Sequence, residues 1–167
     1  MRIRHLIDVP DAVPELTQWF IEEWEPWYGD AGPGDAEGDL VASCRRDALP
    51  IGLVALGETG ELLGTAALKA ESVGSEIGAG PWLAALLVGK AHRGKGVATA
   101  LVAAIEQEAR RLGFDALYTS TDVAEPLLRR RGWQALGTTD SLRGAITIYR
   151  KELRDTAGDE MSRGGRG

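Results

Sequence analysis

Apolar and polar residues alternate, or recur at helical spacing, along most of this chain, and these patterns predict its elements. Residues 2–7 alternate and predict a first strand that ends at Asp8 and Pro10. Residues 11–24 repeat apolar positions every three or four residues and predict a helix, which we expect Asp11 to cap. The apolar face of this helix carries Leu16, Trp19, Phe20 and Trp24.

The segment that follows has the pattern of a loop, a helix and a hairpin. Residues 27–35 are rich in glycine and predict a long loop, and residues 39–46 predict a short second helix. Two apolar runs, 51–56 and 62–70, are separated by G-E-T-G-E, which is typical of a β-hairpin turn. These two runs are therefore predicted to pair as antiparallel strands.

The centre of the chain predicts a β-α-β unit. The run W-L-A-A-L-L-V at 82–88 is apolar throughout and predicts a strand buried on both faces. After a glycine-rich turn, apolar residues recur at helical spacing up to Gly113. The predicted buried face of this helix consists of Val97, Leu101, Ile105, Glu108 or Ala109, and Leu112. A strand over 117–121 then completes a parallel pair through a right-handed crossover.

The last part of the chain predicts a short helix over 124–132 and a final strand over 145–153. Residues 155–167 are polar and end in S-R-G-G-R-G, so we expect them to be disordered. The prediction is one domain over 1–153 and a flexible tail over 154–167.

Composition places the chain among ordinary globular proteins. It has 167 residues, of which 44% are hydrophobic and 26% are charged, enough for one buried core. The single Cys44 excludes an internal disulfide, and with His5 and His92 as the two histidines we expect no metal site. There is no charged-then-apolar leader and no apolar run near the ~18 residues of a membrane helix, so we expect a cytoplasmic protein without a membrane partner.

The net charge of −6 is distributed unevenly. Between His5 and Cys44 there are ten Asp and Glu residues and no Lys or Arg. The basic residues of the middle of the chain include Lys90, Arg93, Lys95, Arg110, Arg111 and Arg129 to Arg131. Such a protein can hold a polyanion at one end and attract a cation to the other. Alternatively, both runs are solvated faces that keep the protein in solution.

The glycine-rich turn V-G-K-A-H-R-G-K-G-V-A-T-A, residues 88–100, nearly matches two phosphate-binding motifs. The loop G-x-x-x-x-G-K-[ST] of nucleotide triphosphatases fails at Gly96, which has no hydroxyl for magnesium. The dinucleotide motif G-x-G-x-x-G fails at Thr99. Both motifs share backbone N–H groups at a helix N-terminus, which bind an anion such as pyrophosphate. An ordinary strand-to-helix turn is the other interpretation.

The six residues Arg93-Gly94-Lys95-Gly96-Val97-Ala98 have the pattern [QR]-x-x-G-x-[GA]. This pattern is the acyl-CoA signature of the GCN5-related N-acetyltransferase (GNAT) family, which the chain resembles most strongly over 83–106. Residues 124–133 resemble the family's second block, and the order of elements covers 1–153. The resemblance implies an α/β (α+β) fold: a mixed, mostly antiparallel twisted sheet with a central parallel strand pair, flanked by helices. It also implies an acetyl-CoA-dependent N-acetyltransferase, in which a primary amine attacks the thioester directly.

The resemblance assigns the acetyl-CoA site to the central strand and the glycine turn. The strand residues Leu86, Leu87 and Val88 are expected to pair with the pantetheine arm, with an N–H at Leu87 or Val88 for the oxyanion. The pyrophosphate is expected to lie against Arg93, Gly94, Lys95, Gly96, Val97 and Ala98, without a metal ion. Thr121 stands where many relatives have an Asn that contacts the arm, and Arg129 to Arg131 are candidates for the adenosine phosphate.

The catalytic residues depart from the family pattern. Many relatives have a Glu on the central strand as base, but 82–88 contains no ionisable side chain. Glu76 is the leading candidate, followed by Glu71 and Asp122. Leu128 occupies the position of the Tyr that protonates the leaving thiolate in many relatives, so Tyr118 or water is expected to replace it.

The acceptor is expected over the first two helices, by similarity to the family. Trp24, Trp27 and Tyr28 lie there among carboxylates, and aromatic rings with negative charge suit a cationic amine. A polyamine-like or aminoglycoside-like molecule, or a peptide amine, fits this description; we expect no nucleic acid partner. The alternatives are a non-catalytic acyl-CoA-binding module and a nucleotide triphosphate protein, and a homodimer stays open.

Overall fold

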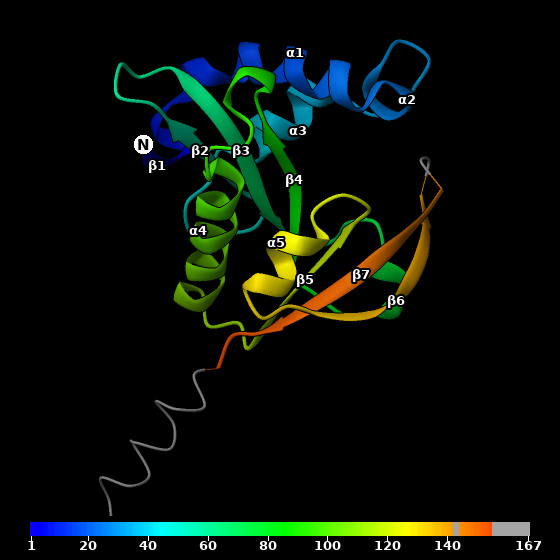
Figure 1. Ribbon diagram of the computed structural model, residues 1–167. Helices are drawn as coiled ribbons and strands as arrows, with labels where there is room; N and C mark the ends of the chain where they lie inside the picture. The colour runs from blue at the N-terminus through cyan, green and yellow to red at the C-terminus, as the bar shows by residue number, and fades with distance from the viewer. Residues whose placement is uncertain (142–143, 155–167) are drawn as a thin grey trace, which may run out of the picture.

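The computed structural model describes residues 1–141 and 144–154, and within them seven strands form one mixed sheet (Figure 1). The strands lie in the order β1-β2-β3-β4-β5-β7-β6. Their bounds are β1 (Arg2–His5), β2 (Ile51–Leu56), β3 (Leu62–Lys69), β4 (Trp82–Val88), β5 (Ala116–Thr121), β6 (Gln134–Ser141) and β7 (Gly144–Glu152). Neighbouring strands are antiparallel except β4 and β5, which are parallel. The predicted central parallel pair is confirmed.

Helices cover both faces of this sheet. The α-helices of the described residues are α1 (Val13–Glu23), α2 (Glu25–Tyr28), α3 (Ala36–Ala42), α4 (Val97–Arg111) and α5 (Glu125–Arg130). Side chains alternate between the faces of β2, so Leu53 and Ala55 pack in a core with α4 and α5, whereas Val54 and Leu56 pack in a second core with α1 and α3. No helix among the described residues is long and apolar enough to cross a membrane.

The parallel strands β4 and β5 separate soon after they meet. Trp82 and Tyr118 are their one registered pair, and the Tyr118 N–H donates to the Pro81 oxygen at 3.0 Å. One residue further along, the Thr119 hydroxyl donates to the Leu83 oxygen at 2.7 Å. Beyond it, β4 contains an irregularity in its pairing with β3, with Ala85 at a φ of 53°. Because a bulge bends a strand, β4 leaves β5 and a gap opens in the sheet.

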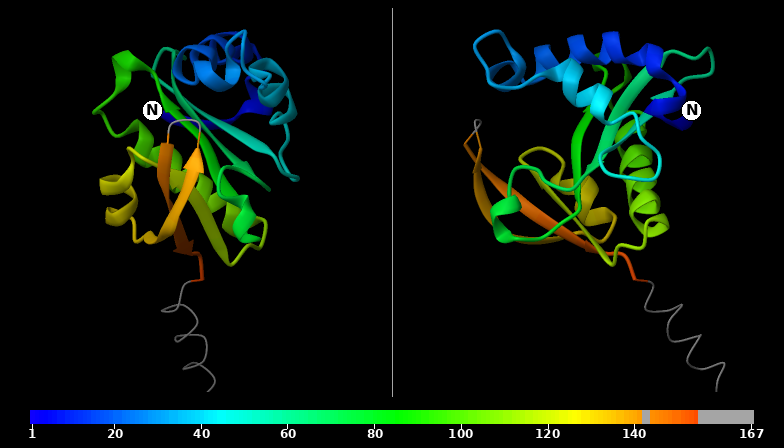
Figure 2. Two further views of the ribbon diagram at one scale, coloured as in Figure 1. Left: turned by 90° about the vertical axis from the view of Figure 1, so that its right-hand side faces the viewer. Right: turned by 180° about the vertical axis from the view of Figure 1, so that it is seen from behind.

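The far end of the sheet curves back toward the first helices. Figures 1 and 2 show β6 and β7 leaving the plane of β2 to β4, so that the end of β6 and the start of β7 lie below α2. The β6–β7 pair also has a register shift between Ala135 and Gly137. The β6–β7 pair therefore lines the space between the β4–β5 gap and α2.

Several predicted boundaries are wrong. The first strand ends at His5 because a 3-10 turn over Leu6–Asp8 follows it. Asp11 does not cap the first helix: a 3-10 turn over Pro10–Ala12 leads directly into α1, whose N-cap is Ala12.

The second helix begins earlier than predicted. It starts at Ala36, because the Asp35 carboxylate accepts a hydrogen bond from the Gly38 N–H at 2.9 Å. Part of the predicted loop forms α2, and β6 lies in a stretch that the sequence pattern does not assign. The predicted tail, from residue 155 on, lies outside the described residues.

Candidate active site

A cleft of about 970 Å³ occupies the gap between β4 and β5. Its floor is the middle of β4, from Leu83 to Leu86, and its walls come from α1 and α2, from the loop after β3, from the end of β5 and from the β6–β7 pair. The predicted burial of β4 on both faces is therefore wrong for its middle: Ala84, Ala85 and Leu86 are half-buried because they face this cleft. A volume of this size suits an extended ligand and a second small molecule together.

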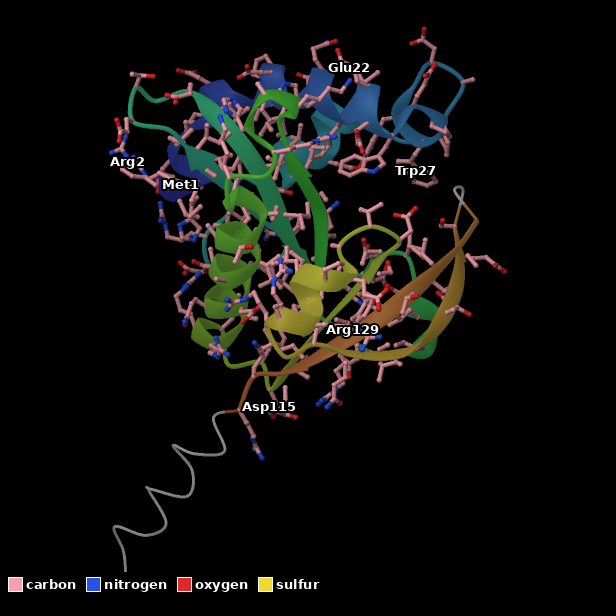
Figure 3. The ribbon with its side chains drawn as sticks, viewed as in Figure 1. Met1, Arg2, Glu22, Trp27, Asp115 and Arg129 are labelled. Carbon is pink, nitrogen blue, oxygen red and sulfur yellow. The ribbon has the colours of Figure 1, made fainter. Side chains whose placement is uncertain are left out.

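One wall of the cleft is aromatic. The Phe20 ring lies 5.1 Å from Trp24, edge to face, and 5.7 Å from Tyr28 in a stacked arrangement. Trp24, Trp27 and Tyr28 all line the cleft, and Trp27 is 44% exposed. Figure 3 shows Trp27 on the side of α2 that faces the cleft. The structure thus brings the three predicted acceptor residues together.

Carboxylates dominate the charge of the cleft. Among the described residues that line it, the acidic ones are Glu23, Asp39, Glu71, Asp122 and Asp140, and the basic one is Lys69. The Tyr28 hydroxyl donates to Asp39 Oδ2 at 2.6 Å. Burial and this bond to a carboxylate raise the pKa of Tyr28 well above its usual value, so its hydroxyl stays a donor. The sign of the lining attracts cations.

The glycine turn lies at the far end of β4 and has the geometry of an anion site. Gly94 and Gly96 have φ of 75° and 84°, and a Cβ added to either would meet nothing within 4 Å. Gly96 is the N-cap of α4 and has no side chain to cap the helix. The first N–H groups of this 15-residue helix are therefore open to an anion.

Side chains link this turn to the cleft. The Arg93 Nε–H donates to the Val88 oxygen at 3.1 Å, and the Arg93 guanidinium lies 3.7 Å from the Glu23 carboxylate. Arg93 therefore connects the glycine turn to the end of β4 and to Glu23 in the cleft lining.

The edge of β4 that faces the cleft has backbone groups without a strand partner. The Gly89 N–H donates to the Leu63 oxygen on β3 at 2.9 Å. Because successive residues of a regular strand point to opposite sides, the N–H of Leu87 also faces β3, and that of Val88 faces away from it. Of the two predicted oxyanion donors, Val88 has the suitable direction. Leu87 is buried in the core beneath α1 and α3.

Thr121 also lies in the cleft, but its side-chain oxygen accepts hydrogen bonds from the backbone that follows it. Thr121 Oγ1 accepts hydrogen bonds from the N–H groups of Val123 at 3.1 Å and Ala124 at 3.2 Å, at the start of α5. Its hydroxyl proton remains available to a ligand. Leu128, which stands at the position of the missing Tyr, lines the cleft as an apolar residue.

The two predicted catalytic residues lie outside the cleft lining. Glu76 is exposed and accepts a hydrogen bond from the Thr139 hydroxyl, which lowers its pKa. A lowered pKa is the opposite of what a general base near neutral pH needs. Tyr118 packs against Trp82 at 5.7 Å between ring centroids, and Arg150 Nε donates to its hydroxyl at 3.3 Å. In contrast, Glu71 and Asp122 line the cleft.

Two of the three arginines predicted near the cofactor have ion-pair partners within the protein. Arg129 pairs with Glu125 at 2.7 Å, and Arg131 pairs with Glu106 at 2.9 Å. Glu106 is fully buried and also contacts Lys151 and the Trp133 ring N–H. Glu106 is not among the residues predicted from the sequence; the signal that points to it is its spacing of four residues from Val102 on the apolar face of α4.

The comparison with family models agrees with this geometry. Residues 13–133 match the acetyltransferase (GNAT) family, a stretch that contains the aromatic wall, the cleft floor and the glycine turn. The chain belongs to the GNAT family. Among curated proteins, none matches the chain.

Solved GNAT structures share the fold over almost the whole chain. An aminoglycoside 6'-N-acetyltransferase complexed with coenzyme A is 17% identical, with a TM-score of 0.74 over 93% of this chain and 98% of that one. The Salmonella typhimurium protein yncA, solved with acetyl-CoA, is 19% identical, with a TM-score of 0.70 over 93% and 95%. A ribosomal-protein-alanine N-acetyltransferase from Brucella melitensis is 20% identical, with a TM-score of 0.71 over 91% and 99%. The predicted family and fold are confirmed.

Proposed function

We propose that this GNAT protein is an acetyl-CoA-dependent N-acetyltransferase that acetylates a primary amine of a cationic acceptor. The observation that carries the proposal is the course of β4. Its free edge runs along the cleft floor and ends in a glycine turn that opens the N-terminus of α4. A ligand with an extended arm and phosphate groups at one end fits this arrangement. Acetyl-CoA has this form and carries its acetyl thioester at the other end of the arm.

The residues that would hold acetyl-CoA follow from the same geometry. The backbone N–H and C=O groups of Leu86 would bond the arm as an added strand. The N–H groups from Arg93 to Ala98 would bond the phosphates, with the charge of Lys95 nearby. The Val88 N–H would stabilise negative charge on the thioester oxygen. The similar structures that contain coenzyme A or acetyl-CoA support this choice of ligand.

The acceptor would enter between the aromatic wall and the β6–β7 pair. Trp24, Trp27 and Tyr28 offer ring faces to a cation, and the surrounding carboxylates raise its local concentration. The aminoglycoside and ribosomal-alanine acetyltransferases of similar fold support an amine acceptor.

The reaction needs a group that accepts a proton from the ammonium of the acceptor. The acceptor's ammonium loses a proton to Glu71 or Asp122, the neutral nitrogen bonds to the thioester carbon, and the carbon–sulfur bond breaks. The second nitrogen proton passes through water to the leaving thiolate, since Leu128 supplies no acid and Tyr118 lies outside the cleft lining. Positioning of the two reactants alone is worth up to about 7–11 kcal/mol.

A thermal shift assay with acetyl-CoA, coenzyme A and Mg-ATP tests the donor. A ligand at about 100 times its Kd adds about 2.7 kcal/mol to stability. We expect both coenzyme A species to raise the Tm and Mg-ATP to leave it unchanged; the reverse pattern would support a nucleotide triphosphate protein. Thiol release with a panel of amines then separates an enzyme from a binding module, which would bind acetyl-CoA without turnover.

A further inference from the structure

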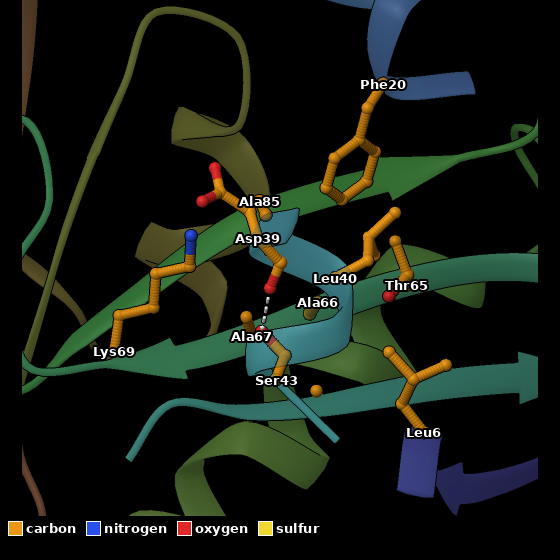
Figure 4. A pocket seen from close by; sticks show the side chains of 11 residues that line it. Leu6, Phe20, Asp39, Leu40, Ser43, Thr65, Ala66, Ala67, Lys69 and Ala85 are labelled. Atoms are coloured by element: carbon orange, nitrogen blue, oxygen red, sulfur yellow. Dashed lines mark hydrogen bonds between the residues drawn. The ribbon is translucent and has the colours of Figure 1, made fainter. Parts of the chain in front are cut away.

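Asp39 lies where two cavities of the structure adjoin. It belongs to α3 and lines both the main cleft and a small adjoining cavity, which is also bounded by Phe20, Ala85 and Lys69 (Figure 4). Ala85 is the residue of positive φ at which β4 turns away from β5. Asp39 therefore lies beside the point where the sheet opens, half-buried beneath the aromatic wall.

The Asp39 carboxylate accepts a hydrogen bond through one of its two oxygens, Oδ2. Tyr28 donates to Oδ2 at 2.6 Å, and among the described residues no other side chain donates to this carboxylate. The helix that carries Asp39 is itself fixed, because Asp35 caps it and the Ser43 hydroxyl donates to the Asp39 backbone oxygen at 3.0 Å. The second oxygen, Oδ1, is thus left in a fixed direction with unused acceptor capacity.

The surroundings of this oxygen suit an ammonium group. The Tyr28 ring, whose hydroxyl orients the carboxylate, is stacked on Phe20 and lies 6.4 Å from Trp24. Aromatic faces next to a carboxylate attract a cation by two additive effects, the ring quadrupole and the full negative charge.

A primary ammonium of the protein already approaches Asp39. Lys69 on β3 lines the same two cavities, and Figure 4 shows its amino group extending toward the Asp39 carboxylate. Within the described residues Lys69 makes no ion pair. Lys69 and an incoming amine would compete for the same negative charge.

We propose that Asp39 binds an ammonium group of the acceptor at the β4 bulge, and that Lys69 weakens this binding by competition. The two residues together then set how strongly the site prefers a cationic acceptor. This inference rests on the proposed function, because it names the group that selects the acceptor of that reaction.

The test measures binding and turnover separately, with spermidine and kanamycin as probes. Their Kd values are measured by calorimetry on the protein loaded with coenzyme A, and kcat and KM by thiol release. We expect Asp39→Asn, which keeps an oxygen for the Tyr28 hydroxyl, to raise Kd and KM for the more tightly bound probe at least tenfold. The acetyl-CoA Kd should stay within twofold, and Asp39→Glu should recover part of the loss.

Two further variants make the test specific. Lys69→Met should lower the probe Kd two- to fivefold, because it removes the competing charge. Glu37→Gln makes the same charge change on the exposed side of α3, outside the cleft lining, and should leave both Kd values unchanged.

The possible failures can be told apart. Wild-type Kd values in Asp39→Asn, equal losses in Asp39→Asn and Glu37→Gln, or no binding of either probe to the wild type would each overturn the Asp39 assignment. If the wild type still binds acetyl-CoA and acetylates some amine, the proposed function survives that result. Absence of acetyl-CoA binding and of transfer to any amine would overturn the proposed function itself.

Discussion

Glu106 is a buried charge whose three partners come from two other parts of the chain. Arg131 Nε lies 2.9 Å from its carboxylate and Lys151 Nζ lies 3.1 Å away, and the Trp133 ring N–H donates at 3.2 Å. Burial alone would raise the pKa of Glu106, but hydrogen bonds from Arg131 and Lys151 outweigh it and hold the pKa below its usual value. The carboxylate therefore joins α4 to the end of α5 and to β7.

Replacement of Glu106 by Gln should destabilise the protein by about 3 kcal/mol near pH 7, because two cations lose a buried counter-charge. A lowered folded pKa means that the ionised form stabilises the fold above the unfolded pKa of about 4.3, and that this contribution is lost as the pH falls through the folded pKa. Urea unfolding of the wild type and of Glu106→Gln from pH 7 to pH 3 measures the difference between their free energies of unfolding. A difference that did not narrow toward pH 3 would contradict the role of the ionised Glu106.

The proton acceptor of the reaction is also a question about single residues. Glu71→Gln or Asp122→Asn should lower kcat by 10- to 100-fold, since each removes a carboxylate of the cleft lining. Glu76→Gln is the matched control and should leave kcat unchanged, because Glu76 lies outside that lining and has a lowered pKa. Steady-state kcat values with acetyl-CoA and the best amine show which of these three carboxylates accepts the proton. A large loss in Glu76→Gln alone would restore it as the base.

At the level of elements, the turn before α4 depends on glycine at positive φ. Gly96→Ala places a side chain at φ 84°, which costs about 1–2 kcal/mol although the new Cβ has open space around it. We expect a stability loss of this size and at least a tenfold rise in the acetyl-CoA Kd, because the first N–H groups of α4 change direction.

Gly78→Ala is the matched control for this change. Gly78 has a φ of 74° and equal open space, but it follows the 3-10 turn at Ser75–Ile77. The control should lose stability without losing acetyl-CoA affinity. Equal affinity losses in both variants, measured by calorimetry, would mean that the turn before α4 has no special role.

For the whole molecule, the acidic lining of the cleft predicts a salt effect that depends on the charge of the acceptor. Five carboxylates and one lysine among the described lining residues attract a cation over a distance comparable to the ~10 Å Debye length at 0.1 M salt. Raising NaCl from about 20 to 300 mM should lower kcat/KM for spermidine about tenfold, and for the monoamine butylamine about twofold. Equal slopes for the two amines would show that the field of the cleft does not steer the acceptor.

The sequence determined the elements whose reason is local. The apolar run of β4, the hairpin of β2 and β3, the periodic face of α4 and the glycine signature before it are each readable because the signal lies within a few residues. The same signals carried the family and the fold. The sequence does not determine boundaries set by short-range hydrogen bonds, such as the start of α3 at the Asp35 cap, because several polar residues nearby can cap a helix equally well.

Only the tertiary structure decided which side chains share the cleft. Asp39 lies on a short helix far along the chain from Lys69 and Ala85, and the three meet because α3 packs on the face of the sheet where β4 bends. Glu76 was the best candidate by position in the chain, yet the curvature of the β6 strand brings Thr139 to it and leaves it outside. A linear pattern records spacing along one element, whereas an active site depends on how the bulge of β4 and the curvature of the sheet place separate elements in space.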